Sequence, residues 1–556
     1  MGLSIKAVVF LIGFVASCVF VIFPVELKFG KKKKFVFPLD YSTAPIIIVL
    51  ILFATTCIPY VVVVRGLLGA DSPDWAKDET STSYLVPYTV VILFMTLAYV
   101  CMSAEHTKAF IYIANKFSNV ALSSSNPSII GLSLFTLLSA IFTLVTSNDI
   151  VILTLTPIIL QFSKKTDPRL LLPLLLAEFC SANSFSAGLL SGNPSNIILS
   201  SVFEINFTTY LQNLLVPAIL SGCVAYLYCV VLAARNRRAQ PLPVHTEMEL
   251  PTMSPQAVKP VAANNEQNTL KPVAANNEQS TLKKPGVVAS SPVAPESLTV
   301  VGIPENEDKK HAELEVKPEK GLHNDHSVKE KSDEEVPLTR NAKFALGILV
   351  MLFCLFLLST PIQNRWSFIE FWHIAVFVFF ITLIKDVLFY WNDLKTIWTV
   401  TKSLPWKVPL FLFAMFILVE TASYYQFTLA VADVFARWIV APVARCGDFA
   451  IAFVFNFITC IACLIFNNLP ATIFITRVIS EKSVKEVLGE KMNMAMFSVA
   501  AGTNFGACIL PNASLAGLMW SSLVKDAKLL KRVWLNGTLV CLLMVIVCSL
   551  VLIIIS

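Results

Sequence analysis

The sequence predicts an all-α polytopic membrane protein with two inverted repeats, each holding a re-entrant helical hairpin and a broken transmembrane helix. The 556 residues are 56% hydrophobic and 14% charged, with a mean hydropathy of +0.70, which is typical of membrane-spanning chains. One apolar segment, residues 130–162, is interrupted by Thr146-Ser147-Asn148-Asp149. Its 33 residues are too few for two crossings, which need roughly 40. A second apolar segment, residues 449–479, is interrupted by Asn467-Asn468-Leu469-Pro470.

The composition argues against a nucleic-acid-binding protein, and we do not expect an enzyme. The net charge of +6 is modest, and no basic face or nucleic-acid-binding module is visible. The 13 cysteines lie almost entirely in apolar runs, as packing residues do. The chain has no Gly-x-x-x-x-Gly-Lys-Ser/Thr loop and therefore no ATP site of that kind. We expect no cofactor and no metal, and a separate ATPase partner is left open.

Residues 1–83 are predicted to hold N-terminal transmembrane helices and an external loop. The apolar run from Val8 to Pro24 is followed by the basic cluster Lys31–Lys34, so we interpret it as a retained helix with its N-terminus outside. A second helix, from Ala44 to Val64, is expected to return outward to an acidic loop.

Residues 84–234 form the predicted transport repeat 1. A helix from Tyr84 to Met102 leads to the hairpin at residues 130–162, and lysines flank both hairpin ends, so both ends are expected at the cytoplasmic face. The next helix runs into Ser191-Gly192-Asn193-Pro194-Ser195-Asn196, where glycine and proline predict a break inside the membrane. A helix from Leu214 to Leu232 completes this repeat.

Residues 235–343 are predicted to be a disordered cytoplasmic linker. They hold 15 Lys and Arg residues and 16 Asp and Glu residues, and a twelve-residue unit occurs twice in tandem, at Lys259–Leu270 and Lys271–Leu282. Such a composition cannot bury enough apolar surface to order itself. A connecting pair of transmembrane helices is expected over residues 344–404.

Residues 405–556 form the predicted transport repeat 2. It has the same order as repeat 1: a helix with a terminal glutamate (Glu420, as Glu105 in repeat 1), an amphipathic stretch, a hairpin at residues 449–479, a broken helix and a plain helix. Counting crossings, repeat 1 starts outside and repeat 2 starts inside, which predicts an inverted relation. Inverted repeats with paired broken helices are typical of secondary transporters, whose substrate binds near the midplane.

Four motifs resemble the arsenite permease family (ArsB) of the ion-transporter superfamily, which also contains NhaD-type antiporters and dicarboxylate carriers. They are Asn148-Asp149 with Leu153–Ile158, Ser191–Ile197, Asn467–Pro470 and Leu515–Trp520. The resemblance implies an ion-transporter fold and a small transported solute. The sequence departs from bacterial arsenite permeases at Gly502-Thr503-Asn504-Phe505-Gly506, which lacks their aspartate.

The predicted solute- and ion-binding residues lie at the hairpin tips and helix breaks. Asp149 is a coupling candidate because an intramembrane carboxyl is a functional site by default, although it also suits an N-cap. Glu178, inside a helix, is the second coupling candidate. The binding residues are Ser147, Asn148, Asp149, Asn193, Ser195, Asn196, Asn467, Asn468, Thr503, Asn504 and Asn512.

The tips and breaks contain one acidic residue, Asp149, and neither Lys nor Arg. A multivalent anion would need cations there, since burying unpaired charge is expensive. We therefore expect efflux of a small neutral oxyacid, such as arsenite, antimonite or silicic acid, coupled to H⁺, with Na⁺ as an alternative coupling ion. A Na⁺/H⁺ antiporter, a sodium-coupled dicarboxylate or citrate carrier, and a receptor or subunit acting through the linker are the alternatives.

The expected partners are the lipid bilayer, of the plasma membrane or of an organelle, and a small inorganic solute; a homodimer is left open.

Cysteine-accessibility labelling tests the predicted orientation. Residues 235–343 and the loop from Lys525 to Arg532 should react only from the cytoplasmic side, and cysteines at Asn206–Thr208 only from outside. Labelling of the linker from outside would contradict this orientation.

Overall fold

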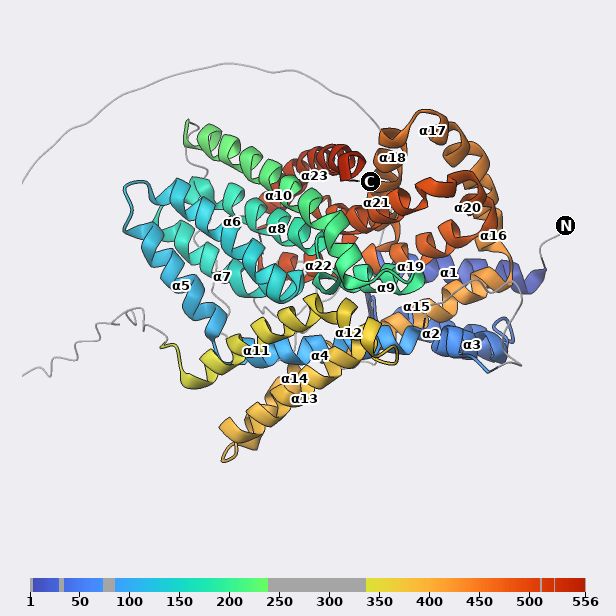
Figure 1. The fold of residues 1–556 in the computed structure, drawn as a ribbon, viewed down its shortest axis with the longest axis horizontal. Helices are drawn as coiled ribbons and strands as arrows, with labels where there is room; N and C mark the ends of the chain where they lie inside the picture. Colours follow the sequence, from blue (N-terminus) through green and yellow to red (C-terminus); the bar gives the residue numbers. More distant parts are fainter. Residues whose placement is uncertain are drawn as a thin grey trace, which may run out of the picture. The chain divides into compact units, whose positions relative to one another are not determined.

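The computed structural model describes residues 4–29, 35–73, 86–238, 337–510, 513–524 and 526–555, drawn in Figure 1. Within these ranges, 11 helices are long and apolar enough to cross a membrane. This confirms the predicted α-helical multi-pass membrane protein. Several predictions concern residues outside these ranges: Lys31–Lys34, the linker between residues 239 and 336, Asn512 and Lys525.

The N-terminal region differs from its prediction in two ways. After α1 (Ile5–Ile22), β1 (Val25–Phe29) and β2 (Phe35–Leu39) form an antiparallel hairpin, which was not expected. The predicted helix from Ala44 to Val64 is two helices, α2 (Thr43–Ala54) and α3 (Tyr60–Leu68), followed by η1 (Gly69–Asp71). The single helix was wrong because Pro59 disfavours helical geometry in the residue before it, and Thr56 takes a φ of +56°.

The first unit follows its predicted order. The hairpin is α6 and α7, and the break falls between α8 and α9, where Gly188–Asn193 leave the α-helical path. The elements are α4 (Pro87–His106), α5 (Ala109–Leu122), α6 (Pro127–Val145), α7 (Asn148–Lys165), η3 (Pro168–Leu170), α8 (Leu171–Ala187), η4 (Leu190–Gly192), α9 (Pro194–Val202) and α10 (Phe207–Arg238).

The second unit repeats this order with a more divided amphipathic stretch. Its elements are α15 (Lys407–Tyr424), α16 (Phe427–Phe435), the π-helix η5 (Ala436–Val440), α17 (Ala441–Arg445), α18 (Asp448–Phe466), α19 (Asn468–Ser480), α20 (Lys482–Leu488), η6 (Gly489–Lys491), α21 (Met492–Phe505), η7 (Gly506–Cys508), α22 (Leu515–Leu523) and α23 (Ala527–Ile555). The inverted relation of the two units stays a prediction.

The two units pack against each other through corresponding elements. Helix α8, in which 15 of 17 residues are buried, contacts α21. Helix α10 lies beside α23, as the green and dark red helices of Figure 1 show. Helix α7 of the first hairpin packs on α22, and α19 of the second hairpin packs on α9. Each hairpin therefore contacts the broken helix of the other unit.

A buried ion pair attaches the connecting helices to the first unit. These helices are α11 (Arg340–Leu357), α12 (Ser359–Arg365), α13 (Phe371–Phe389) and the unpredicted α14 (Leu394–Ser403). Lys385 and Asp386 of α13 lie 2.6 Å apart, and Asp386 accepts hydrogen bonds from Tyr99 (3.0 Å) and Ser103 (2.9 Å) of α4. These hydrogen bonds satisfy the buried carboxylate, as burial of charge requires.

Glycine allows the close contact of α18 with α21. A Cβ on Gly502 would lie 2.5 Å from the Asn456 carbonyl oxygen and 2.8 Å from the Thr459 Cβ. Gly502→Ala should therefore lower thermal stability by roughly 1–3 kcal/mol, the usual cost of overpacking. Gly347→Ala, in α11 with no atom within 4 Å of the new Cβ, is the matched control and should keep or slightly raise the melting temperature. Equal melting temperatures for the two variants would contradict the packing argument.

Candidate solute-binding site

The tip of the first hairpin is held by an amide pair. Helix α6 ends at Val145, and Ser147 precedes the first residue of α7. Asn148, only 1% exposed, donates a hydrogen bond from Nδ2 to Oδ1 of Asn183 on α8 (3.1 Å). Its own Oδ1 accepts from the Asp149 backbone N–H (3.0 Å). Asn148 thus fixes the tip against α8 and orients the following residue.

Asp149 is the residue of this tip whose carboxylate faces open space. Its side chain and that of Ser147 are half-buried and line a cavity of about 900 Å³. Among the described residues, no hydrogen-bond donor and no cation lies within bonding distance of its carboxylate. Burial raises the pKa of neighbouring Tyr41 above its ordinary value, and the charges of Asp40 and Asp149 raise that pKa further.

The cavity joins the first hairpin tip to several other parts of the chain. Ser191 and Pro194 contribute from the first break, and Ser521 and Ser522 contribute from α22. Its remaining charged residues come from outside the predicted motifs: Glu26 on β1, Asp40 after β2, Lys402 on α14 and Lys407 on α15. The lining therefore holds two lysines and three carboxylates, Asp149 included, for a formal charge of −1.

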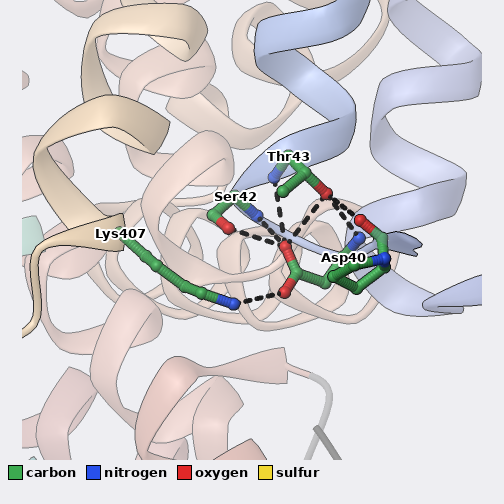
Figure 2. A network of polar contacts seen from close by, with 5 residues as sticks. Asp40, Ser42, Thr43 and Lys407 are labelled. Carbon is green, nitrogen blue, oxygen red and sulfur yellow. Dashed lines mark hydrogen bonds and ion pairs between the residues drawn. The ribbon is translucent and has the colours of Figure 1, made fainter. Parts of the chain in front are cut away.

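Figure 2 shows how Asp40 holds Lys407 at this cavity. The Lys407 Nζ lies 2.7 Å from Asp40 Oδ2, while Oδ1 accepts from the Ser42 hydroxyl (2.6 Å) and from the backbone N–H groups of Ser42 and Thr43. Burial raises the pKa of Asp40, but these hydrogen bonds outweigh it and leave the pKa below the usual 3.8. Lys407 is the first residue of α15, where the helix dipole disfavours a cation, so the ion pair also stabilises the start of the helix.

The two helix breaks are joined by a network of amide side chains, all of them buried. Asn504 Oδ1 accepts from the Asn193 amide (3.0 Å) and from the Ser186 hydroxyl (2.8 Å), and its Nδ2 donates to Asn196 Oδ1 (2.8 Å). Asn196 Nδ2 in turn donates to the backbone carbonyls of Ser186 and Leu189 (2.7 and 2.8 Å). The network therefore satisfies backbone groups that the first break leaves without helical partners.

The second hairpin tip lies outside the large cavity. Neither Asn467 nor Asn468 lines it, and both are 3% exposed. Asn467 takes a φ of +71° between α18 and α19, a conformation that asparagine tolerates better than most residues. Asn468 Oδ1 is buried and has no hydrogen-bond partner among the residues that the structure describes.

Three other predicted residues are enclosed. Glu178 is fully buried, and its carboxylate accepts from the Thr156 hydroxyl (2.8 and 3.1 Å) on α7. Thr503 donates to the Ala500 carbonyl (2.9 Å). The Ser195 hydroxyl is buried and has no hydrogen-bond partner in the described part of the chain. None of the three lines the large cavity. Of the predicted residues that the structure describes, only Ser147 and Asp149 line its wall.

Sequence analysis missed the cavity's lysines and the carboxylates of Glu26 and Asp40. The predicted site included only residues inside apolar interruptions, whereas these four lie on β1, directly after β2, on α14 and at the start of α15. Lys407 carried a usable signal, because a lysine at a helix start needs an acidic partner. The identity of that partner, 367 residues away, had no signal in the sequence.

Removal of the Asn504 amide tests the network. Asn504→Ala should lower thermal stability by roughly 1–3 kcal/mol, because the Asn193, Asn196 and Ser186 groups lose their partner in a buried place. Asn213→Ala is the control, since the half-buried Asn213 makes one local bond to the Thr209 carbonyl (2.8 Å) on α10. Thermal unfolding of the two purified variants measures the difference, and equal losses would contradict the network's role.

Comparison with known proteins supports a transporter. The model of the citrate transporter family matches residues 42–502, which include both hairpins and the first break. A Dictyostelium discoideum protein named "Putative transporter arsB" is 36% identical over 88 residues. That alignment covers 16% of this chain and 16% of the relative.

These matches confirm the resemblance to the ion-transporter superfamily inferred from the four motifs. The family match extends from the ion-paired loop before α2 to α21, and so contains Asp149, Lys407 and most of the amide network. The chain is a multi-pass membrane protein, and it belongs to the citrate transporter family.

Proposed function

We propose that this protein is a secondary active transporter that carries a small neutral oxyacid through the large cavity, with Asp149 as its proton-coupling group. The observation that carries the proposal is the position of Asp149: it lies at a hairpin tip, faces the cavity and has no donor or cation bonded to its carboxylate among the described residues. A carboxyl group in such a place can bind and release a proton as its access to water alternates.

The cavity charge supports a neutral solute. Three carboxylates and two lysines line it, so the formal charge is −1 with Asp149 ionised and 0 with Asp149 protonated. Lys407 is already paired with Asp40 at 2.7 Å. A di- or trianion entering this space would meet no surplus of positive charge, and its desolvation would go uncompensated. An uncharged oxyacid needs only hydrogen bonds, which Ser147, Ser191 and Ser521 can give.

A carboxylate such as citrate is the second candidate. Two observations favour it: the description of the matched family as citrate transporters, and the presence of Lys402 and Lys407 on the cavity wall. Lys407 is 47% exposed, and a carboxylate could displace Asp40 from it. The cavity volume of about 900 Å³ lies within the range of organic-ligand sites and so admits either solute.

Replacement of Asp149 tests the coupling. Asp149→Asn should abolish pH-driven flux in proteoliposomes while leaving the protein folded, because asparagine keeps the shape and the capping ability. Asp433→Asn is the matched control: Asp433 is half-buried on α16 and does not line the cavity. Its flux should equal that of the unmodified protein. Flux of Asp149→Asn with an unchanged pH dependence would remove Asp149 from the coupling role.

Replacement of Lys407 separates the two solutes. If the solute is neutral, a proton gradient should drive arsenite or silicic acid transport in proteoliposomes. Lys407→Gln should then leave the apparent KM for that solute nearly unchanged. A carried carboxylate would lose a charge-assisted bond worth roughly 1.5–3 kcal/mol, so its apparent KM should rise about tenfold or more. Citrate or succinate flux driven by sodium, with no movement of neutral oxyacids, would overturn the first reading.

A further inference from the structure

One carboxyl group lies inside the first unit, away from the large cavity. Glu178, in the middle of α8, and Thr156, on α7, are both 0% exposed. The Thr156 hydroxyl lies 2.8 and 3.1 Å from the two carboxyl oxygens of Glu178, and neither residue lines the large cavity. An ionised carboxylate in such a place needs a cation or several donors, and without them the group takes up a proton instead.

No charged side chain of the surrounding elements neutralises this carboxyl group. Helices α6, α21 and α22 and η4 carry no titratable residue. Among the described residues, no ion pair includes Glu178, and the tyrosines and cysteines of the neighbouring elements are uncharged at neutral pH. The charged groups on the other elements packed against α8 are Asp149, Lys164 and Lys165 on α7, Arg169 on η3, the arginines of residues 235–238 on α10 and the basic residues of 528–532 on α23.

A third partner of this carboxyl group comes from the second unit. Trp520, on α22, is 1% exposed, and its ring packs on that of Phe179 with 5.0 Å between the centroids. Its indole N–H adjoins the carboxyl group of Glu178, yet forms no hydrogen bond of good geometry among the described residues. A neutral carboxylic acid suits both neighbours, because its O–H can donate to Thr156 Oγ1 and its carbonyl oxygen can accept from the indole.

The backbone around Glu178 is fixed by bonds that leave its side chain free to make these contacts. Ser139 of α6 donates to the backbone carbonyl of Glu178 (2.9 Å), and Ser181 of α8 donates to the carbonyl of Thr136 on α6 (3.0 Å). These two bonds join α6 to α8 and give the carboxyl group no donor. Its hydrogen bonding therefore depends on α7 and α22.

We propose that Glu178 holds a proton permanently and that this neutral carboxylic acid joins α7 of the first hairpin to α8 and α22. Thr156 follows Asp149 by seven residues, about 10 Å along the same face of α7, so the bond to Thr156 positions Asp149 at the cavity. Glu178 is thus a positioning residue, in place of the coupling role predicted from the sequence. In the part that rests on the proposed function, Asp149 alone exchanges the transported proton.

Infrared spectroscopy tests the proton without any transport assay, because the C=O stretch of a carboxylic acid is separate from the bands of a carboxylate. The unmodified protein should show a carboxylic-acid band at neutral and at mildly alkaline pH, and Glu178→Gln should lack it. Glu486→Gln is the matched control, since the Glu486 side chain is 65% exposed beside Lys482 on α20. This control should keep the band.

Thermal unfolding at several pH values gives an independent measure. The unfolded chain releases the Glu178 proton above about pH 4.3, whereas the folded protein keeps it, so the stability of the unmodified protein falls as the pH rises. Its melting temperature should therefore fall relative to that of Glu178→Gln by about 1–2 °C per pH unit. Glu486→Gln should follow the unmodified protein.

Two further variants keep the proposal testable if Glu178→Gln does not fold. Thr156→Val removes one hydrogen bond and should shift the carboxylic-acid band without abolishing it. Glu178→Ala should melt several degrees below the unmodified protein, and Glu178→Gln, which keeps a donor and an acceptor, should restore most of that loss.

Three results would overturn the resident proton. They are an unchanged carboxylic-acid band in Glu178→Gln or Thr156→Val, parallel pH dependences of melting for the unmodified protein and Glu178→Gln, and a melting temperature that rises with sodium in place of choline in the unmodified protein alone. The last result would mean that Glu178 is ionised and binds a metal cation. Loss of pH-driven flux is not among the readouts, so the proposed function can fail while this inference stands.

Discussion

A helix that stops and restarts inside a membrane leaves backbone groups that cannot turn to water. In this protein a helix break lies between α8 and α9, and the amide of Asn196 bonds the backbone carbonyls of Ser186 and Leu189 there. The Asn196 amide is in turn positioned by Asn504, from the second unit, through a bond of 2.8 Å. The backbone of one unit is thus satisfied through a side chain of the other.

This arrangement separates two kinds of polar residue that look alike in the sequence. Asn193, Asn196 and Asn504 have their hydrogen-bonding groups occupied by one another and by neighbouring groups of the protein, whereas Asp149 and Lys407 face a large cavity. A polar group that already has its hydrogen bonds within the protein would have to break them to bind a solute, and its former partner would then be left unsatisfied at a cost in free energy. Under the proposed function, the residues at the cavity wall are those whose protonation and pairing would change as solute passes.

Much of the fold could be predicted from the sequence because bilayer thickness fixes helix length. The apolar run at residues 130–162 was too short for two crossings, and the structure places there two helices joined at Thr146 and Ser147. The split of the second helix at Pro59 and the strands at Val25–Phe29 and Phe35–Leu39 were missed. Short elements carry little hydrophobic signal, and they depend on tertiary contacts.

The candidate site was less predictable than the fold. Interruptions in apolar runs identified Ser147 and Asp149, which line the cavity. Interruptions in apolar runs also pointed to Asn468 and Thr503, which are buried away from the cavity. Whether such a residue is buried or faces a cavity depends on how distant helices pack. The pairing of Asp40 with Lys407 joins the first strand pair to the start of α15, and no local pattern encodes such a contact.

The crossed packing of the hairpins limits how the molecule can be divided into moving bodies. Helix α7 packs on α22 and α19 packs on α9, so each hairpin rests on the other unit. If the chain were cut at the linker, the hairpin in each fragment would lose the helix of the other fragment on which it packs. Any body that moves as a unit while keeping these contacts must therefore combine the hairpin of one unit with the half-helix of the other, two segments that are far apart in the sequence.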